Sequence, residues 1–313
     1  MPLTSLAELV EAVLRSGRRP RVAIAPCADE FILRGGIEAH SQGLADPVLI
    51  GDMQRAAQVA DEHGLDISGF ESVHEPDAAA AVNRAVRMYR EGAVSIIMKG
   101  LISTAVVLKA VLNKETGVPP VSGILSHVTV FDAPTGGRLM LLTDAGVNIR
   151  PNLQRKADIL RNALNVARRL GMDCPRAAML AATEKVNYPA MPATLDADVI
   201  SKMAAQGQFG RCLVHGPLAL DLAISPQAAV TKGVNHPVAG HADILCTPDI
   251  ESGNMLYKAL GILHGSTLAS VVVGSRVPVV VPSRSDSAES KFHSIALAAF
   301  LAADSSADVG DKQ

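Results

Sequence analysis

The stretch AVSIIMKGLISTAVVLKAVL, residues 93–112, contains the repeating unit of the fold. Its first part, Ala93–Met98, is an apolar run with little period-2 alternation, which predicts a strand covered by helices on both faces. The part from Thr104 to Leu112 predicts a helix, and a polar junction separates the two. Strands that alternate with helices of this kind indicate βαβ units and a mostly parallel sheet, so we expect an α/β protein.

The same alternation extends in both directions along the chain. Before this unit, we expect strands at 21–26 and 47–51 and helices at 5–15, 29–42, 52–63 and 77–90. After it, we expect a hairpin of strands 124–131 and 138–142, strands at 177–182, 212–215, 243–247, 268–274 and 277–281, and helices at 151–170, 194–206, 226–233, 251–264 and 287–303. A length of 313 residues is typical of about two domains. No linker is visible, which suggests that the chain crosses between domains more than once and predicts a ligand cleft between them.

Composition excludes several classes of protein. Hydrophobic residues make up 48% of the chain, which excludes wholesale disorder. The net charge is 29 − 31 = −2, with no basic excess that would suit nucleic acid. Aromatic residues are only 3%, with no Trp, so stacking platforms for bases are not expected either. The core is therefore expected to consist of Ala, Val, Leu and Ile, and no nucleic-acid partner is expected.

The cellular compartment is predicted from the cysteines and from the apolar runs. The four cysteines are scattered and form no CxxC pair, as is typical of a reducing compartment. Glu8 and Glu11 interrupt the apolar N-terminus, so it is not a signal peptide. The longest apolar run, Ile295–Ala303, is far shorter than the ~20 residues of a membrane span. We therefore expect a cytoplasmic protein without a membrane partner.

Common catalytic motifs are absent from the sequence. It contains no GxxxxGK[ST] loop, no GxGxxG after a strand, no HExxH and no GxSxG. His236 and His241 lie five residues apart around Pro237 and Gly240, so they share no helix face. These histidines are expected in loops, and no metal site is predicted.

Polar residues instead gather where apolar strands end, which is where α/β sheets bind ligands. At the first such junction the strand is followed by Lys99 and Gly100, and Ser103 or Thr104 caps the next helix. A lysine beside a helix N-terminus forms an anion site. The alternative is an ordinary cap with a solvated lysine.

Two further junctions lie in the middle of the chain. Lys232 and Gly233 end a short helix, where they suit either a ligand or a simple C-cap. Asp249 and Glu251 flank the start of another helix, in the stretch PDIESGNMLYK, residues 248–258. Gly253 in its first turn costs helix stability, which the close approach of a ligand or of a neighbouring backbone would explain. Ordinary acidic N-terminal residues are the alternative.

The fourth junction, VPSRSDS, residues 281–287, carries an arginine among hydroxyl groups. Ser283 and Arg284 lie on the loop, and Asp286 or Ser287 caps the final helix. A guanidinium beside hydroxyls and unpaired backbone N–H groups suits a phosphate. The alternative is an arginine paired on the surface with Asp286 or Glu289.

These junctions, in this order, resemble the phosphate acetyltransferase and phosphate butyryltransferase family. The matching stretches are MKGLIST at 98–104, VTKGV at 230–234, the segment 239–257 with its PDIESGNMLYK core, and SRSDSAE at 283–289. The Lys-Gly and Ser-Arg-x-Asp-Ser-Ala-Glu forms are closer to the butyryl branch. The resemblance implies two α/β domains like those of the isocitrate and isopropylmalate dehydrogenases. The first would comprise residues 1–135 plus 275–313 and the second residues 136–274.

The resemblance also implies a reaction: acyl-CoA plus phosphate gives acyl phosphate plus CoA, reversibly, in a homodimer and with no metal or tightly bound cofactor. By position, Ser283 would bond near the sulfur or carbonyl of the thioester and Arg284 would bind phosphate. The acetyl branch has a base seven residues after the serine, where this chain has Ser290, so Glu289 and Asp286 are the carboxylates on offer.

Substrate-binding residues are also implied by the matching stretches. These are Lys99, Gly100, Ser103, Thr104, Lys232, Asp249, Glu251, Asn254 and Lys258.

Two other functions stay open at this point. One is a metal- and NAD-dependent dehydrogenase on the same fold, with Asp243 and Asp249 as the available ligands, which NAD reduction with a hydroxy acid would reveal. The other is a CoA- or acyl-phosphate-binding protein without catalysis, motivated by Ser290. Ligand-induced thermal stabilisation without turnover would indicate it.

Overall fold

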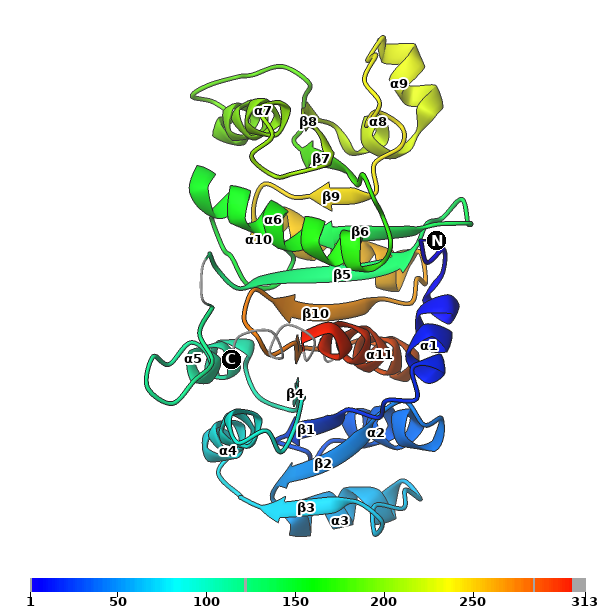
Figure 1. Ribbon diagram of the computed structural model, residues 1–313, viewed down its shortest axis with the longest axis vertical. Coiled ribbons are helices and arrows are strands. Elements are labelled where there is room, and N and C mark those ends of the chain that lie inside the picture. Colours follow the sequence, from blue (N-terminus) through cyan, green and yellow to red (C-terminus); the bar gives the residue numbers. More distant parts are fainter. Residues whose placement is uncertain (1, 121–122, 284, 306–313) are drawn as a thin grey trace, which may run out of the picture. The chain divides into compact units, whose positions relative to one another are not determined.

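The computed structural model describes residues 2–120, 123–283 and 285–305. The chain divides into two α/β units (Figure 1), one formed by Met1–Ser5 and Gly123–Ser266, the other by Leu6–Ser122 and Thr267–Gln313. We call them the middle unit and the terminal unit. The chain therefore changes unit at residues 5/6, 122/123 and 266/267, whereas the expected boundaries lie at 135/136 and 274/275.

Pairing of the strands explains these boundaries. The hairpin strand that ends at Thr143 pairs in parallel with Ile244–Cys246, so the hairpin belongs with the middle unit. The strand Ala269–Val273 pairs antiparallel with Val279–Val280 and packs against the final helix, so it belongs with the terminal unit.

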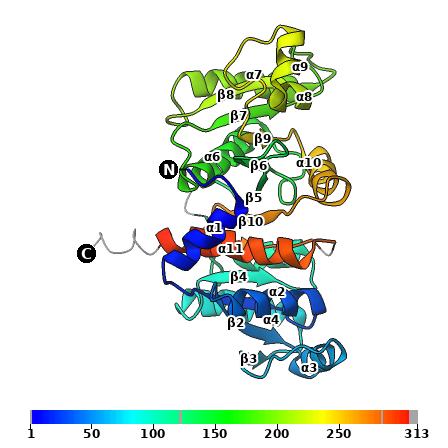
Figure 2. The same ribbon diagram turned by 90° about the vertical axis from the view of Figure 1, so that its right-hand side faces the viewer.

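The terminal unit has a sheet of six strands in the order β3-β2-β1-β4-β11-β10. Its strands are β1 Arg21–Ala25, β2 Asp46–Gly51, β3 Glu71–His74, β4 Ile96–Lys99, β10 Ala269–Val273 and β11 Val279–Val280. Its helices are α1 Leu6–Arg15, α2 Glu30–Ser41, α3 Met53–Glu62, α4 Ala78–Arg90, α5 Thr104–Val111 and α11 Ala288–Ser305. Helices α1, α2 and α11 pack together on one face of the sheet, while α4 and α5 pack on the other (Figures 1 and 2). Helices thus cover both faces, as the apolar strands predict.

The middle unit has five strands in the order β5-β6-β9-β7-β8. They are β5 Ser126–Asp132, β6 Leu139–Thr143, β7 Arg176–Leu180, β8 Leu213–Leu218 and β9 Ile244–Cys246. Its helices are α6 Leu153–Arg169, α7 Pro192–Ala205, α8 Leu220–Ile224, α9 Pro226–Lys232 and α10 Ile250–Lys258, which continues as a π-helical turn Ala259–Leu263. The predicted β5–β6 hairpin is confirmed as an antiparallel pair, and the remaining pairs are parallel.

Two elements were not predicted. Strand β3 lies at the edge of its sheet and is mostly exposed, so its sequence lacks an apolar run. Helix α8 has only five residues, too few to produce a helical period.

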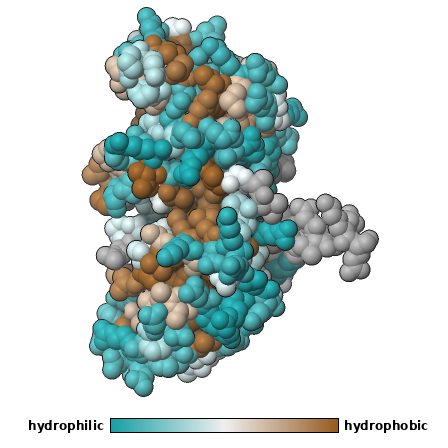
Figure 3. Space-filling view, turned by 90° about the vertical axis from the view of Figure 1, so that its left-hand side faces the viewer, coloured by the Kyte–Doolittle hydropathy of each residue, from teal (hydrophilic) through white to brown (hydrophobic). Residues whose placement is uncertain are grey.

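The core of both units consists chiefly of aliphatic side chains, as the composition predicts. Some apolar side chains also reach the surface, and Figure 3 shows one face on which they gather in patches. Leu101, in the loop before α5, is 52% exposed, and Leu263 at the end of the π-helical turn is 85% exposed. Within the described ranges, no helix is long and apolar enough to cross a membrane.

Candidate functional site

The strand order of the terminal unit contains a point where the direction of winding changes. The chain runs outward from β1 to β2 and β3, then returns through α4 to β4 on the other side of β1. Ligands of open α/β sheets bind outside the carboxyl ends of the strands at such a point. A ligand site is therefore expected at the loops after β1 and β4.

Strand register brings the loop after β11 to the same edge. Strand β11 pairs in parallel with β4, with Val280 opposite Met98. Val281 follows the end of β11 and Lys99 is the last residue of β4, so both lie at this edge of the sheet. Two of the four predicted junctions are thus brought together, those of Lys99 and of Ser283.

Lys99 is a buried lysine at the carboxyl end of β4, only 7% exposed. Its Nζ donates hydrogen bonds to the carbonyl oxygens of Gly100 and Ile102, both at 3.1 Å. The ammonium group therefore lies within the loop that leads into α5, and the alternative of a solvated lysine is wrong. A buried positive charge at this point favours an anion.

Gly100 is required by a close approach of backbone to backbone. A Cβ atom at this position would lie 1.6 Å from the carbonyl oxygen of Pro26, in the loop after β1. The Gly100 N–H also donates to the carbonyl oxygen of Ala25 at 3.0 Å. The glycine thus joins the loops after β1 and β4 across the point where the winding changes.

The N-terminus of α5 is not closed by its own capping residue. Ser103 is the N-cap and Thr104 the first helical residue, but the Ser103 side chain makes no capping hydrogen bond and is exposed. By contrast, Asp29, Asp52 and Asp77 cap α2, α3 and α4 with their carboxylates. An N-terminus of this kind leaves backbone N–H groups for an anion.

The loop after β11 is closed by Asp286. Its Oδ2 accepts the Ser283 N–H at 2.7 Å, and its own N–H donates to the Ser283 carbonyl oxygen at 3.2 Å. The hydroxyls of Ser283 and Ser285 lie 3.1 Å apart. Arg284, between them, lies outside the described residues. Ser287 rather than Asp286 caps α11, because its Oγ accepts the Ser290 N–H at 3.0 Å.

Ser290 is buried and bonded within the fold. It is 5% exposed, and its Oγ accepts the N–H of Leu268, the residue before β10, at 3.0 Å. It also accepts a hydrogen bond from the Ser287 hydroxyl at 3.1 Å. This hydroxyl therefore holds β10 to α11.

Glu289 faces the side of α11 that packs beside α2. It lines a cavity of about 510 Å³ together with residues of α2, among them Arg34 and Glu38, and with His293 one turn further along α11. The predicted pair of carboxylates is therefore split. Asp286 lies in the loop that carries Ser283, while Glu289 opens toward α2.

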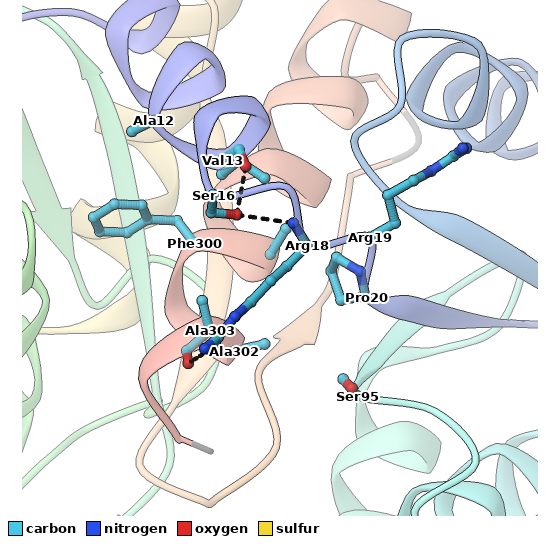
Figure 4. Close-up of a pocket in the computed structure, with 11 residues that line it drawn as sticks. Ala12, Val13, Ser16, Arg18, Arg19, Pro20, Ser95, Phe300, Ala302 and Ala303 are labelled. Atoms are coloured by element: carbon cyan, nitrogen blue, oxygen red, sulfur yellow. Dashed lines mark hydrogen bonds between the residues drawn. The ribbon is translucent and has the colours of Figure 1, made fainter. Parts of the chain in front are cut away.

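The opposite edge of the terminal sheet has a second cavity of about 450 Å³ (Figure 4). Pro20 and Ser95, just before β1 and β4, line it together with the ends of α1 and α11. Two of its polar side chains are bonded to the protein: Arg18 Nη1 donates to the Ala303 carbonyl oxygen at 2.7 Å and Ser16 Oγ to that of Val13 at 2.6 Å. No predicted site residue lines this cavity.

In the middle unit, the start of α10 packs on the loop after β6. Asp249 is the N-cap of α10 and accepts the Ser252 N–H at 2.9 Å. A Cβ atom on Gly253 would lie 2.3 Å from the carbonyl oxygen of Asp144, so a neighbouring backbone, not a ligand, requires this glycine. Asn254 Nδ2 donates to the Ala145 carbonyl oxygen at 3.2 Å.

The other residues predicted in the middle unit lie on its surface. Glu251 pairs with Arg150 at 3.7 Å, and Lys258 is exposed at the end of α10. Lys232 is exposed at the end of α9, where Gly233 adopts a left-handed conformation (φ 69°) and forms the C-cap. The simple cap therefore explains Gly233 fully.

Sequence reasoning missed two buried groups beside these loops. Asp144 follows β6, is 3% exposed, and accepts N–H groups of Gly146 and Val147 at 2.9 Å and the Asn148 side chain at 2.7 Å. Its place after an apolar strand is the same signal that marked the four junctions. The second group is Lys291 of α11, which carried no such signal because it lies inside a predicted helix.

Asp243, a metal-ligand candidate of the dehydrogenase alternative, is bonded within the fold, and two cysteines are buried. Asp243 accepts hydrogen bonds from Arg138 and Arg176 at 2.9–3.0 Å, which ties together the starts of β6, β7 and β9. In the part of the chain that the structure describes, no three His, Cys, Asp or Glu residues are placed to hold a metal. Burial raises the pKa of Cys27 to about 11 and that of Cys246 to about 12, so both remain thiols.

Comparison with known proteins decides the family. A model of the family described as "Phosphate acetyl/butaryl transferase" matches residues 71–299. A phosphate butyryltransferase of Clostridium acetobutylicum is 42% identical over 300 residues, which cover 96% of this chain and 99% of that protein. The chain belongs to the phosphate acetyl/butyryl transferase family.

The names of similar proteins specify different acyl groups. A phosphate acetyltransferase of Rhizobium meliloti is also 42% identical, over 278 residues covering 89% of this chain and 87% of that protein. A branched-chain phosphotransacylase of Enterococcus faecalis has a solved structure with a TM-score of 0.78 and 35% identity, covering 90% of this chain and 99% of that one. The predicted family and α/β fold are confirmed, and the family of acyltransferases replaces the dehydrogenase alternative.

Proposed function

We propose that this protein transfers a short acyl group between coenzyme A and inorganic phosphate, giving acyl phosphate and free CoA. The observation that carries the proposal is the junction of β4 and β11 in a chain of this family. There, the buried ammonium of Lys99 and the N-terminus of α5 adjoin the loop of Ser283. Positive charge at this edge suits an oxyanion nucleophile.

The chemistry needs positioning more than a covalent intermediate. A phosphate oxygen attacks the thioester carbonyl, a C–O bond forms, and the C–S bond breaks with its electrons leaving on sulfur. Phosphate would be bound by Arg284, Lys99, Ser103 and the backbone N–H groups that begin α5 at Thr104. The CoA thiol, with a pKa near ~8.5, leaves as thiolate or takes a proton. In this proposal Ser283 donates a hydrogen bond to the sulfur or to the carbonyl oxygen.

The carboxylates of Asp286 and Glu289 have different roles in this proposal. Asp286 positions the loop, because its Oδ2 accepts the Ser283 N–H. Glu289, which is exposed, is the general-base candidate for the thiol in the reverse reaction. Glu289→Gln would then lower turnover in CoA acylation, without changing the KM for phosphate in the forward direction.

CoA binding is proposed to involve the middle unit as well. Lys232 and Lys258 offer exposed positive charge for the phosphates of CoA, and Asp249, Glu251 and Asn254 surround the start of α10. We further propose a homodimer that needs no metal or tightly bound cofactor, and a cytoplasmic location. Sedimentation velocity of the purified protein tests the dimer.

Thiol release from acetyl-, propionyl- and butyryl-CoA, with and without phosphate, tests the reaction. Phosphate-dependent release is expected from at least one of them, and its absence from all three would overturn the proposal. If the protein binds acyl-CoA, shown by a rise in Tm, but turns none over, it is a binding protein instead. The panel also measures chain-length preference, since one methylene changes selectivity by only ~10–200-fold.

Arg284→Ala tests the phosphate site. We expect the KM for phosphate to rise by ~10-fold or more, the size expected for a lost charge-assisted hydrogen bond, with the KM for acyl-CoA little changed. Arg276→Ala is a matched control, because Arg276 is an exposed arginine before the same strand, at its opposite end. Unaltered phosphate kinetics in Arg284→Ala would remove Arg284 from the site.

A further inference from the structure

Lys291, in the first turns of α11, is an unusual buried cation, only 2% exposed. Its Nζ donates a hydrogen bond to the carbonyl oxygen of Asp286 and lies 5.2 Å from the ring centroid of Phe31 in α2. Desolvation, the largest effect, lowers the pKa of this lysine, while the charges of Asp286 and Asp29 act in the opposite direction. Both carboxylates therefore favour the charged form of this lysine.

Packing alone does not require a lysine at this position. Its Cβ lies against α2, where a methyl group on Gly35 would approach it to 3.3 Å. An apolar chain of similar length would fill this space without the cost of burying an ammonium group. The hydrogen bond to the Asp286 carbonyl oxygen is what an apolar chain would lose.

The Asp286 carbonyl belongs to the loop that carries Ser283 and Arg284. Asp286 closes that loop from one side by accepting the Ser283 N–H and by donating to the Ser283 carbonyl oxygen. Lys291 holds the other side of the same residue. The loop is thus fastened to α11, and through Phe31 to the start of α2.

We propose that Lys291 is a positioning residue for phosphate: its ammonium holds the Ser283–Asp286 loop in place and adds positive charge to this edge of the sheet. The proposal rests on the proposed function. It assigns Lys291 no contact with substrate and predicts a specific effect on the phosphate side of the reaction.

Lys291→Met tests this role, because methionine keeps the length and loses the donor and the charge. We expect amide exchange of the peptide containing residues 283–287 to rise by ~10-fold and the KM for phosphate to rise by a similar factor, the size expected when a hydrogen bond to a charged group is lost. The KM for acyl-CoA should stay within twofold. Lys291→Arg keeps the charge and should recover part of both effects.

Ser294→Ala is the matched control. Ser294 is buried one turn further along α11, and its Oγ accepts the N–H of Ser270 at 2.8 Å. This variant should lose stability without changing exchange at 283–287 or the KM for phosphate. If Lys291→Met behaves as Ser294→Ala does, Lys291 is only structural and the proposal is overturned.

A second variant and the activity of the wild-type protein distinguish the remaining outcomes. If Lys291→Met does not fold, Phe31→Leu replaces it; removing the ring beside Nζ should raise exchange at 283–287, and unchanged exchange would overturn the proposal. If the wild-type protein shows no phosphate-dependent thiol release, the proposed function fails. The exchange data then still decide whether Lys291 fastens the loop.

Discussion

Replacement of Ser290 with alanine separates a structural role of this hydroxyl from a catalytic one. The residue stands where the acetyl branch is expected to have its base. In this chain its Oγ accepts the Leu268 N–H at 3.0 Å in a buried environment. We predict that Ser290→Ala lowers stability and leaves the chemical step intact.

The magnitude follows from the hydrogen bonds that Ser290 makes. Alanine leaves the buried Leu268 N–H without its acceptor, which costs ~1–3 kcal/mol. The Ser287 hydroxyl also loses its acceptor, but Ser287 is exposed and water replaces the bond. At ~2–4 °C per kcal/mol, the scale for chains of ~150–250 residues, Tm should fall by about 2–12 °C.

Two assays are needed, thermal unfolding and steady-state kinetics at 25 °C. Turnover should stay within ~3-fold of the wild-type rate, whereas removal of a general base costs ~10²–10⁴-fold. Ser294→Ala is the control, because it removes an equivalent acceptor from the Ser270 N–H on the same helix. Turnover slowed by ~100-fold or more, with an unchanged Tm, would refute the structural role of Ser290.

Three further predictions concern other parts of the chain. Gly100→Ala should destabilise by about 3 kcal/mol in urea unfolding, because its Cβ would lie 1.6 Å from the Pro26 carbonyl oxygen; a loss under ~0.5 kcal/mol would contradict this close contact. The rings of His215 and His236 stack with their centroids 4.1 Å apart, and burial lowers the pKa of both below the usual ~6.5. The unfolded chain therefore binds more protons, and the free energy of unfolding should fall as the pH falls below ~6.5. His215→Asn should weaken that fall, measured between pH ~7.5 and ~5.5. Cys246, fully buried with a pKa raised to about 12, should escape iodoacetamide in the native protein, as peptide mass spectrometry would show.

Most of the elements of this fold are predictable from local pattern. Strands β1, β2 and β4 are apolar runs next to polar junctions, and each is buried almost throughout. Strand β3 escaped prediction because an edge strand needs no apolar run. The unit boundaries at 122/123 and 266/267 differ from those expected, because they depend on which strands pair and no local signal carries that information.

The residues of the candidate site were predictable from the sequence, but the role of each residue was less predictable. Its strand-end junctions are visible in sequence, and two of them meet through the register of β4 and β11. The reason for Gly100 and Gly253, the burial of Lys99 and the contacts of Ser290 all depend on atoms distant in the chain. Lys291 was overlooked because a lysine in a helix is normally exposed.

The sequence by itself determined the alternation of strands and helices, the family, and the polar residues that end the strands, because these depend on local pattern and on short motifs. The tertiary structure alone decided which of those residues make structural contacts with the backbone and which place a positive charge at the edge of the sheet. Burial and hydrogen bonding arise from neighbours such as Pro26 and Leu268, which no local stretch around Gly100 or Ser290 contains.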